Sequence, residues 1–105
     1  MCWFHQGLTD SFWGPTYEPL TCLGLLAGSC GVHYSSDPKR RPALHAALEA
    51  KAIEPSIAID DYAAVLFVDG KVAQVVSWHE GATAYEVLLK DGHAKETRYE
   101  CREIH

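Results

Sequence analysis

The chain has 105 residues, of which 48% are hydrophobic and 22% charged, so it is long enough to bury one core and is not disordered in composition. Its formal net charge is −5, and its only basic cluster is residues 39–41, which argues against nucleic acid or an anionic membrane surface as a partner. No stretch is apolar for long enough to span a bilayer, and no signal-peptide pattern is present. We therefore expect a cytoplasmic protein whose four cysteines are reduced.

The first four residues, Met1-Cys2-Trp3-Phe4, are strongly apolar and have no capping residue before them, which is typical of the interior of an element. Residues 7–19 combine glycines and prolines with aromatic side chains, a composition that predicts an ordered loop. The apolar run over residues 23–27 predicts a short buried strand.

A helix is predicted to begin at Asp37-Pro38, with Asp37 as the N-cap and Pro38 at the first helical position. Its apolar residues, Leu44, Ala47 and Leu48, recur at helical spacing, and we expect it to end near residue 52.

The remainder of the chain predicts β structure. Residues 56–59 form a short strand candidate, and Asp69-Gly70 predicts a tight hairpin between strands at 63–68 and 72–77. Asp91-Gly92 predicts a second hairpin between residues 87–89 and 94–101. These elements indicate an α/β fold with one main helix plus β-hairpins. Since one helix covers only one face of an open sheet, we expect the other face to be uncovered.

One histidine, one pair of acids and one further acid are candidates for chemistry. His33 follows a glycine-rich strand end, which is where open α/β sheets place their sites, although a histidine there can also be purely structural. Asp60 and Asp61 end an apolar stretch, so that one of them can orient an imidazole, or both can simply form a turn. Asp10 lies beside Thr9 and Ser11, where it forms an Asx turn or acts as an accessory acid.

No nucleophile is evident among the residues. The chain contains no Gly-x-Ser-x-Gly elbow, and Cys30 lies in apolar surroundings in which thiols are usually inert. A zinc site from Cys22, Cys30 and His33 would lack a fourth ligand at a regular spacing. We expect neither a metal nor a cofactor.

An ordered series of motifs extends over most of the chain: Cys2-Trp3-Phe4, the residues 7–12, the residues 23–29, His33-Tyr34, the residues 40–43, the residues 58–61, the strand at 63–68 and Val75-Val76-Ser77. This series resembles the C-terminal half of the peptidase E family of serine peptidases, which includes aspartyl dipeptidases and cyanophycinases. The resemblance implies that residues 1–105 form a single partial domain. That domain would be the C-terminal portion of a three-layer α/β sheet of the class I glutamine amidotransferase type.

The resemblance also implies roles for particular residues. His33 matches the catalytic histidine, Asp61 matches the third acid of the triad with Asp60 as its neighbouring alternative, and Asp10 matches an acid that follows the nucleophile helix. Arg41, or else Arg40, matches the arginine that holds an acidic substrate side chain. Val32 stands where the family usually has proline, and Ser35 where it often has an acid.

In the family, a Ser-Ala-Gly elbow comes directly before the segment that matches residues 1–4, which would then be the body of a helix. The resemblance therefore implies a peptidase fragment that acts on small peptides, carries the general base, lacks the nucleophilic serine and is inactive alone. A second hypothesis is one half of a split enzyme, completed by an N-terminal half or a homo-oligomer. A third is a non-catalytic interaction module whose apolar surface comprises Trp3, Phe4, Phe12 and Trp13.

Overall fold

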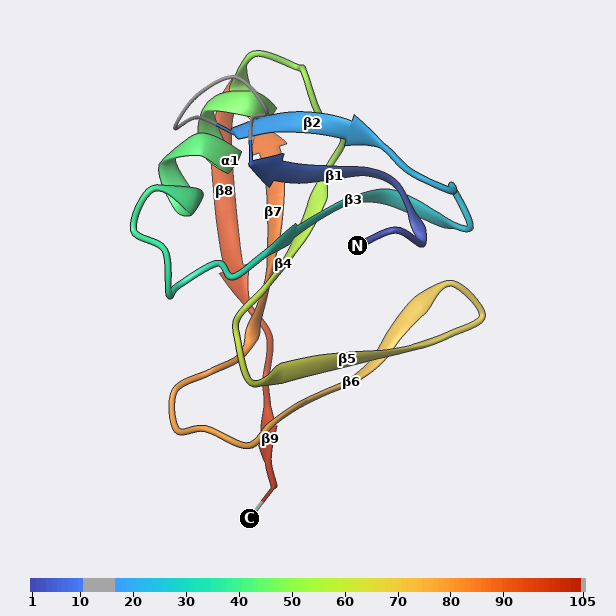
Figure 1. Ribbon diagram of the computed structural model, residues 1–105, viewed down its shortest axis with the longest axis vertical. Helices are drawn as coiled ribbons and strands as arrows, with labels where there is room; N and C mark the ends of the chain where they lie inside the picture. Colours follow the sequence, from blue (N-terminus) through green and yellow to red (C-terminus); the bar gives the residue numbers. More distant parts are fainter. Residues whose placement is uncertain (11–16, 105) are drawn as a thin grey trace.

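The computed structural model describes residues 1–10 and 17–104, except for the side chain of Asp10. Two sheets and one helix make up this part of the chain. Figure 1 shows how they are arranged. The larger sheet has six strands in the order β2 (Tyr17–Thr21), β1 (Phe4–Asp10), β3 (Leu26–Val32), β4 (Ser56–Ile59), β7 (Ala84–Lys90) and β8 (His93–Arg98). The smaller sheet has the order β5 (Ala63–Val68), β6 (Lys71–Ser77) and β9 (Arg102–Glu103). The helix is α1 (Arg40–Glu49). The predicted α/β class is confirmed in this form, with more strand than helix.

The centre of the larger sheet is parallel. β1 pairs with β3, and β3 pairs with β4, both in parallel, whereas β2, β7 and β8 add on in antiparallel fashion. The segment β3–α1–β4 is therefore a strand–helix–strand crossover unit. Since three parallel strands end at one edge of the sheet, the residues that follow them share that edge.

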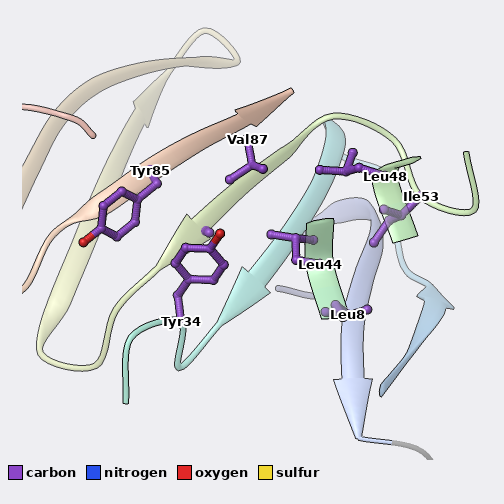
Figure 2. Close-up of a cluster of buried hydrophobic side chains, with 8 residues drawn as sticks. Leu8, Tyr34, Leu44, Leu48, Ile53, Tyr85 and Val87 are labelled. Atoms are coloured by element: carbon purple, nitrogen blue, oxygen red, sulfur yellow. The ribbon is translucent and has the colours of Figure 1, made fainter. Parts of the chain in front are cut away.

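The helix covers one face of the larger sheet. Leu44 and Leu48 of α1 pack with Leu8, Tyr34 and Val87, and the rings of Tyr34 and Tyr85 lie 5.4 Å apart between their centroids. Figure 2 shows these side chains gathered between the helix and the strands. Because each is almost wholly removed from water, this cluster is the main hydrophobic core.

The opposite face is partly covered by the smaller sheet. Phe4, Cys30 and Ile57 of the larger sheet pack with Val75 of β6, and the Phe4 ring meets the Phe67 ring edge to face at 5.6 Å. The expectation of an uncovered face is therefore wrong in part. The predicted hairpin at Asp69-Gly70 folds back against this face and supplies a third layer.

The amino-terminal expectations are corrected by the structure. Phe4 opens β1 and does not belong to a helix, and the predicted loop over residues 7–19 gives way to strand at both of its ends. Non-local pairing explains the difference, because β1 lies between β2 and β3 and forms hydrogen bonds with both. Its sequence lacks the alternation that would have indicated a strand.

The strand predicted over residues 23–27 is also displaced. Gly24, with φ of +76°, forms a turn in which Leu23 and Leu25 are exposed, and β3 begins only at Leu26. Gly28, with φ of +84°, lies where β3 has one residue more than β1 in their register.

The helix is shorter than predicted at both ends. The side chain of Asp37 accepts the N–H of Lys39 at 3.0 Å, so that Asp37 and Pro38 form a turn before α1 begins at Arg40. Lys51 adopts a φ of +57° after the last turn and ends the helix before residue 52. Both hairpins are confirmed, since Asp69-Gly70 and Asp91-Gly92 have positive φ at each residue, as a type I′ turn requires.

Candidate active site

The candidate site lies at the carboxyl edge of the three parallel strands. His33 directly follows β3, and Asp61 follows β4, whose last residue is aligned with Val32 in the sheet. The Nδ1 of His33 lies in hydrogen-bond contact with a carboxylate oxygen of Asp61. The side chain of His33 is 58% exposed, so it can be reached from solvent.

The conformation of the His33 backbone directs its side chain out of the strand. Its φ of +54° lies in the left-handed region, which is uncommon for a residue with a side chain. The N–H of Tyr34 donates to the Ile59 carbonyl at 3.3 Å, and the His33 carbonyl accepts from Asp37 at 3.4 Å. The turn is thus held by β4 on one side and by the start of the helical segment on the other.

The two neighbouring acids have different surroundings. The Asp60 carboxylate is buried and accepts the backbone N–H groups of Ser35 at 3.0 Å and Thr83 at 3.1 Å. Asp61 is partly exposed, and hydrogen bonds from Ser36 and then His33 hold the pKa of its carboxyl below its ordinary value. Of the two alternatives left open by the sequence, Asp61 is the one that contacts His33, and Asp60 ties the loops together.

Asp10 belongs to the same edge by its backbone position. It ends β1, two residues beyond Leu8, which is paired with Gly31, and His33 lies two residues beyond Gly31. The side chain of Asp10 lies outside the described residues, as do Phe12 and Trp13. A catalytic role for Asp10 stays a prediction.

Both arginines predicted to bind an acidic substrate have partners within the chain. Arg40 is buried, donates to the Leu8 carbonyl at 3.0 Å and lies 4.5 Å above the Tyr17 ring. Arg41 donates to Glu96 at 3.0 Å and lies 4.6 Å above the Tyr34 ring. Their role in binding stays a prediction, which would require these contacts to be shared or given up.

A polar cluster that the sequence did not indicate surrounds Glu96 of β8. Its carboxylate accepts from Tyr34 and Arg41, and it lies 3.4 Å from His45 Nε2. Burial raises the pKa of this carboxyl, but the hydrogen bonds from Tyr34 and Arg41 outweigh that effect and hold it below its ordinary value. No local signal in the sequence joins β8 to the helix, so only the fold shows this cluster.

Of the four cysteines, Cys30 is the buried one. The four cysteines are free thiols, and burial raises the pKa of Cys30 to about 11, which keeps that thiol protonated and inert at neutral pH.

In the part of the chain that the structure describes, no group of three His, Cys, Asp or Glu side chains could hold a metal ion. Over the same residues, no helix is long and apolar enough to cross a membrane.

Comparison with known proteins decides the family. Peptidase family S51 matches residues 1–75 of the chain. The chain belongs to this peptidase family. A Bacillus subtilis (strain 168) protein described as the uncharacterized peptidase YgaJ is 41% identical over 91 residues, which cover 87% of this chain.

Those residues cover only 39% of the Bacillus relative, so the chain spans well under half the length of the curated protein it matches. No solved structure matches the chain. The match over residues 1–75 includes His33, both arginines and the Asp60–Asp61 pair.

Proposed function

We propose that this chain carries the general base and its orienting acid for a serine-type peptidase site. The observation that carries the proposal is the contact of His33 with Asp61 at the ends of two neighbouring parallel strands. In such a pair, the carboxylate holds one imidazole nitrogen as a donor, which leaves the other nitrogen free to take a proton from a serine hydroxyl. The same imidazole then returns the proton to the leaving amine.

The nucleophile in this proposal comes from outside the 105 residues. The chain contains no Gly-x-Ser-x-Gly, and loss of a triad serine lowers turnover by about a millionfold. We propose that the chain alone does not hydrolyse peptides. The larger sheet would then be the C-terminal part of a sheet of the class I glutamine amidotransferase type, completed by another segment.

The position of the amino terminus bears on how such a segment could be attached. β1 starts at Phe4 and ends at Asp10, and a strand rises about 3.3 Å per residue, so its two ends are about 20 Å apart. A serine elbow joined directly to Met1 would therefore lie at the end of the sheet away from His33. Residues 1–4 must leave their present position for such an elbow to reach the imidazole.

An exposed apolar surface favours an added partner. Trp3, Leu23 and Leu25 are each more than half exposed, and backbone hydrogen bonds between residues 2–3 and residues 23–26 bring them together. Phe4, which was expected to belong to a contact surface, is instead buried. The exposed cluster supports either a completing half or a non-catalytic interaction partner.

The test is hydrolysis of small peptides by the purified chain, first alone and then produced together with the unmatched part of the Bacillus relative. We expect no turnover alone, turnover after completion, and its loss in His33→Ala. His93→Ala, which changes an exposed histidine in β8, is the matched control and should retain turnover. Turnover by the chain alone that His33→Ala abolishes would overturn the external nucleophile. Turnover after completion that survives His33→Ala would overturn the assigned base.

A further inference from the structure

A pocket of about 370 Å³ lies next to the His33–Asp61 pair. Three connections form its walls: the loop after β3, the turn after β4 and the loop after β6. Asp61 lines this pocket and also contacts His33, so a molecule in the pocket lies beside the proposed base. The lining residues are Ser35, Ser36, Asp60, Asp61, Tyr62 and His79 together with residues 80–82.

One wall of the pocket consists of two stacked rings. Tyr62 and His79 lie 5.3 Å apart between ring centroids at an interplanar angle of 19°. Tyr62 is the third residue of a turn closed by the Ala63 N–H and the Asp60 carbonyl, and its φ of +65° is one that such turns usually assign to glycine or asparagine. A large ring at a strained position, 57% exposed, adds nothing to the core. Its ring instead lines the pocket and stacks on His79.

The charges around the pocket are negative. Asp61 and Glu80 line it, both oxygens of Asp60 are taken by backbone N–H groups, and no lysine or arginine is among the described lining residues. The structure gives the Glu80 carboxylate no ion-pair partner among the residues it describes. An acidic side chain in this pocket would meet like charges, whereas a cationic side chain would meet a carboxylate and the face of the Tyr62 ring that is not stacked on His79.

We infer that this pocket is a side-chain subsite for a basic residue of the peptide substrate, an inference that rests on the proposed peptidase function. Tyr62 provides a flat surface for the aliphatic and guanidinium or ammonium parts of the side chain, and Glu80 provides the opposite charge. Both are specificity-determining residues that take no part in proton transfer. The contacts of Arg41 agree with a preference for a basic substrate residue. Arg41 is already paired with Glu96 and lies over the Tyr34 ring, so its guanidinium is not free to bind an acidic side chain of a substrate.

The activity test uses the chain completed as above and compares kcat/KM for otherwise identical peptides with arginine or aspartate beside the scissile bond. We expect the arginine peptide to be preferred, and expect Glu80→Gln and Tyr62→Gly each to lower that preference about fivefold, the size of an exposed ion pair or a cation–π contact. Glycine is chosen at position 62 because it accepts the positive φ. Asp91→Asn, which removes one carboxylate from a distant turn, is the control and should leave the preference unchanged.

A binding test on the 105-residue chain separates this inference from the peptidase proposal. N-acetylarginine amide should shift the resonances of Tyr62 and His79, and N-acetylaspartate amide should not. Binding that is weakened by Glu80→Gln supports the subsite even if no completed protein hydrolyses peptides. A preference for the aspartate peptide, or equal effects of both amides on Tyr62, would overturn the subsite while leaving His33 and Asp61 as the proposed pair.

Discussion

Two kinds of left-handed residue that are not glycine can be compared in the part of the chain that the structure describes. Asp69 and Asp91 are the first residues of hairpin turns, where the following glycine shares the conformation and the turn type requires it. His33 and Tyr62 follow parallel strands, and neither precedes a glycine. An L residue in this region costs about 1–2 kcal/mol.

The difference shows where the chemistry of a side chain is retained in spite of the conformational strain of its backbone. At the hairpins, aspartate is a residue that tolerates the conformation well. At the strand ends, an imidazole and a phenol occupy positions that glycine would fill at lower free energy. Strained residues of this kind cluster at functional sites, and these two flank the same carboxylate, Asp61.

The largest effect that tests this comparison is the replacement His33→Gly. We expect the free energy of unfolding, measured by urea titration, to rise by about 1 kcal/mol because strain is relieved. We expect turnover of the completed protein to fall by about 10⁴-fold or more. Asp69→Gly is the matched control, for which we expect a smaller gain in the free energy of unfolding and unchanged turnover. Turnover retained within tenfold in His33→Gly would contradict the comparison.

The next largest effect concerns Gly28, where a left-handed residue is also crowded. A Cβ at this position would lie 2.7 Å from the Pro55 carbonyl oxygen, in addition to the φ of +84°. We expect Gly28→Ala to lower the free energy of unfolding by about 2–4 kcal/mol. Gly31→Ala is the control in the same strand, since its Cβ would meet Leu44 at an ordinary 3.5 Å without a positive φ. Equal losses in the two variants would show that β3 can move away from Pro55.

The smallest effect is the titration of Asp61, followed through its carboxyl carbon by NMR. Its pKa should lie below the ordinary value of about 3.9, since Ser36 and His33 favour the ionised form. Any stability gained from these contacts is therefore complete when the pH is above the ordinary pKa of the carboxyl. It is lost as the pH falls through the lowered pKa that Asp61 has in the folded chain. Ser36→Ala should raise the pKa of Asp61 towards the ordinary value. An identical midpoint in the variant would mean that Ser36 does not support the pair.

Local signals in the sequence were sufficient for some elements and not for others. The two Asp-Gly hairpins depend on the conformations of two adjacent residues, and the centre of α1 depends on helical spacing, so both could be predicted. β1 could not, because its strand character comes from pairing with β2 and β3 and not from its own pattern. The apolar residues Leu23 and Leu25 misplaced β3, since burial and not hydrophobicity decides which residues enter a central strand.

The candidate site was likewise predicted in part from the sequence and in part visible only in the fold. The motif order singled out His33 and the Asp60–Asp61 pair, but which acid contacts the imidazole depends on a turn that also involves Thr83 of a later segment. His79 was one of the six histidines, with no feature of its own, until the loop after β6 placed it against Tyr62. Sites assembled from separate loops become visible only when the loops are placed together.

The positions of β2 and β8 at the two edges of the larger sheet have a consequence for solubility. β2 includes Pro19, which has no N–H to offer a further strand, and β8 carries Lys95, Glu96 and Arg98. Proline and charge on edge strands are devices that prevent runaway edge-to-edge pairing between copies of a protein. We therefore expect the folded chain on its own to resist amyloid-like growth.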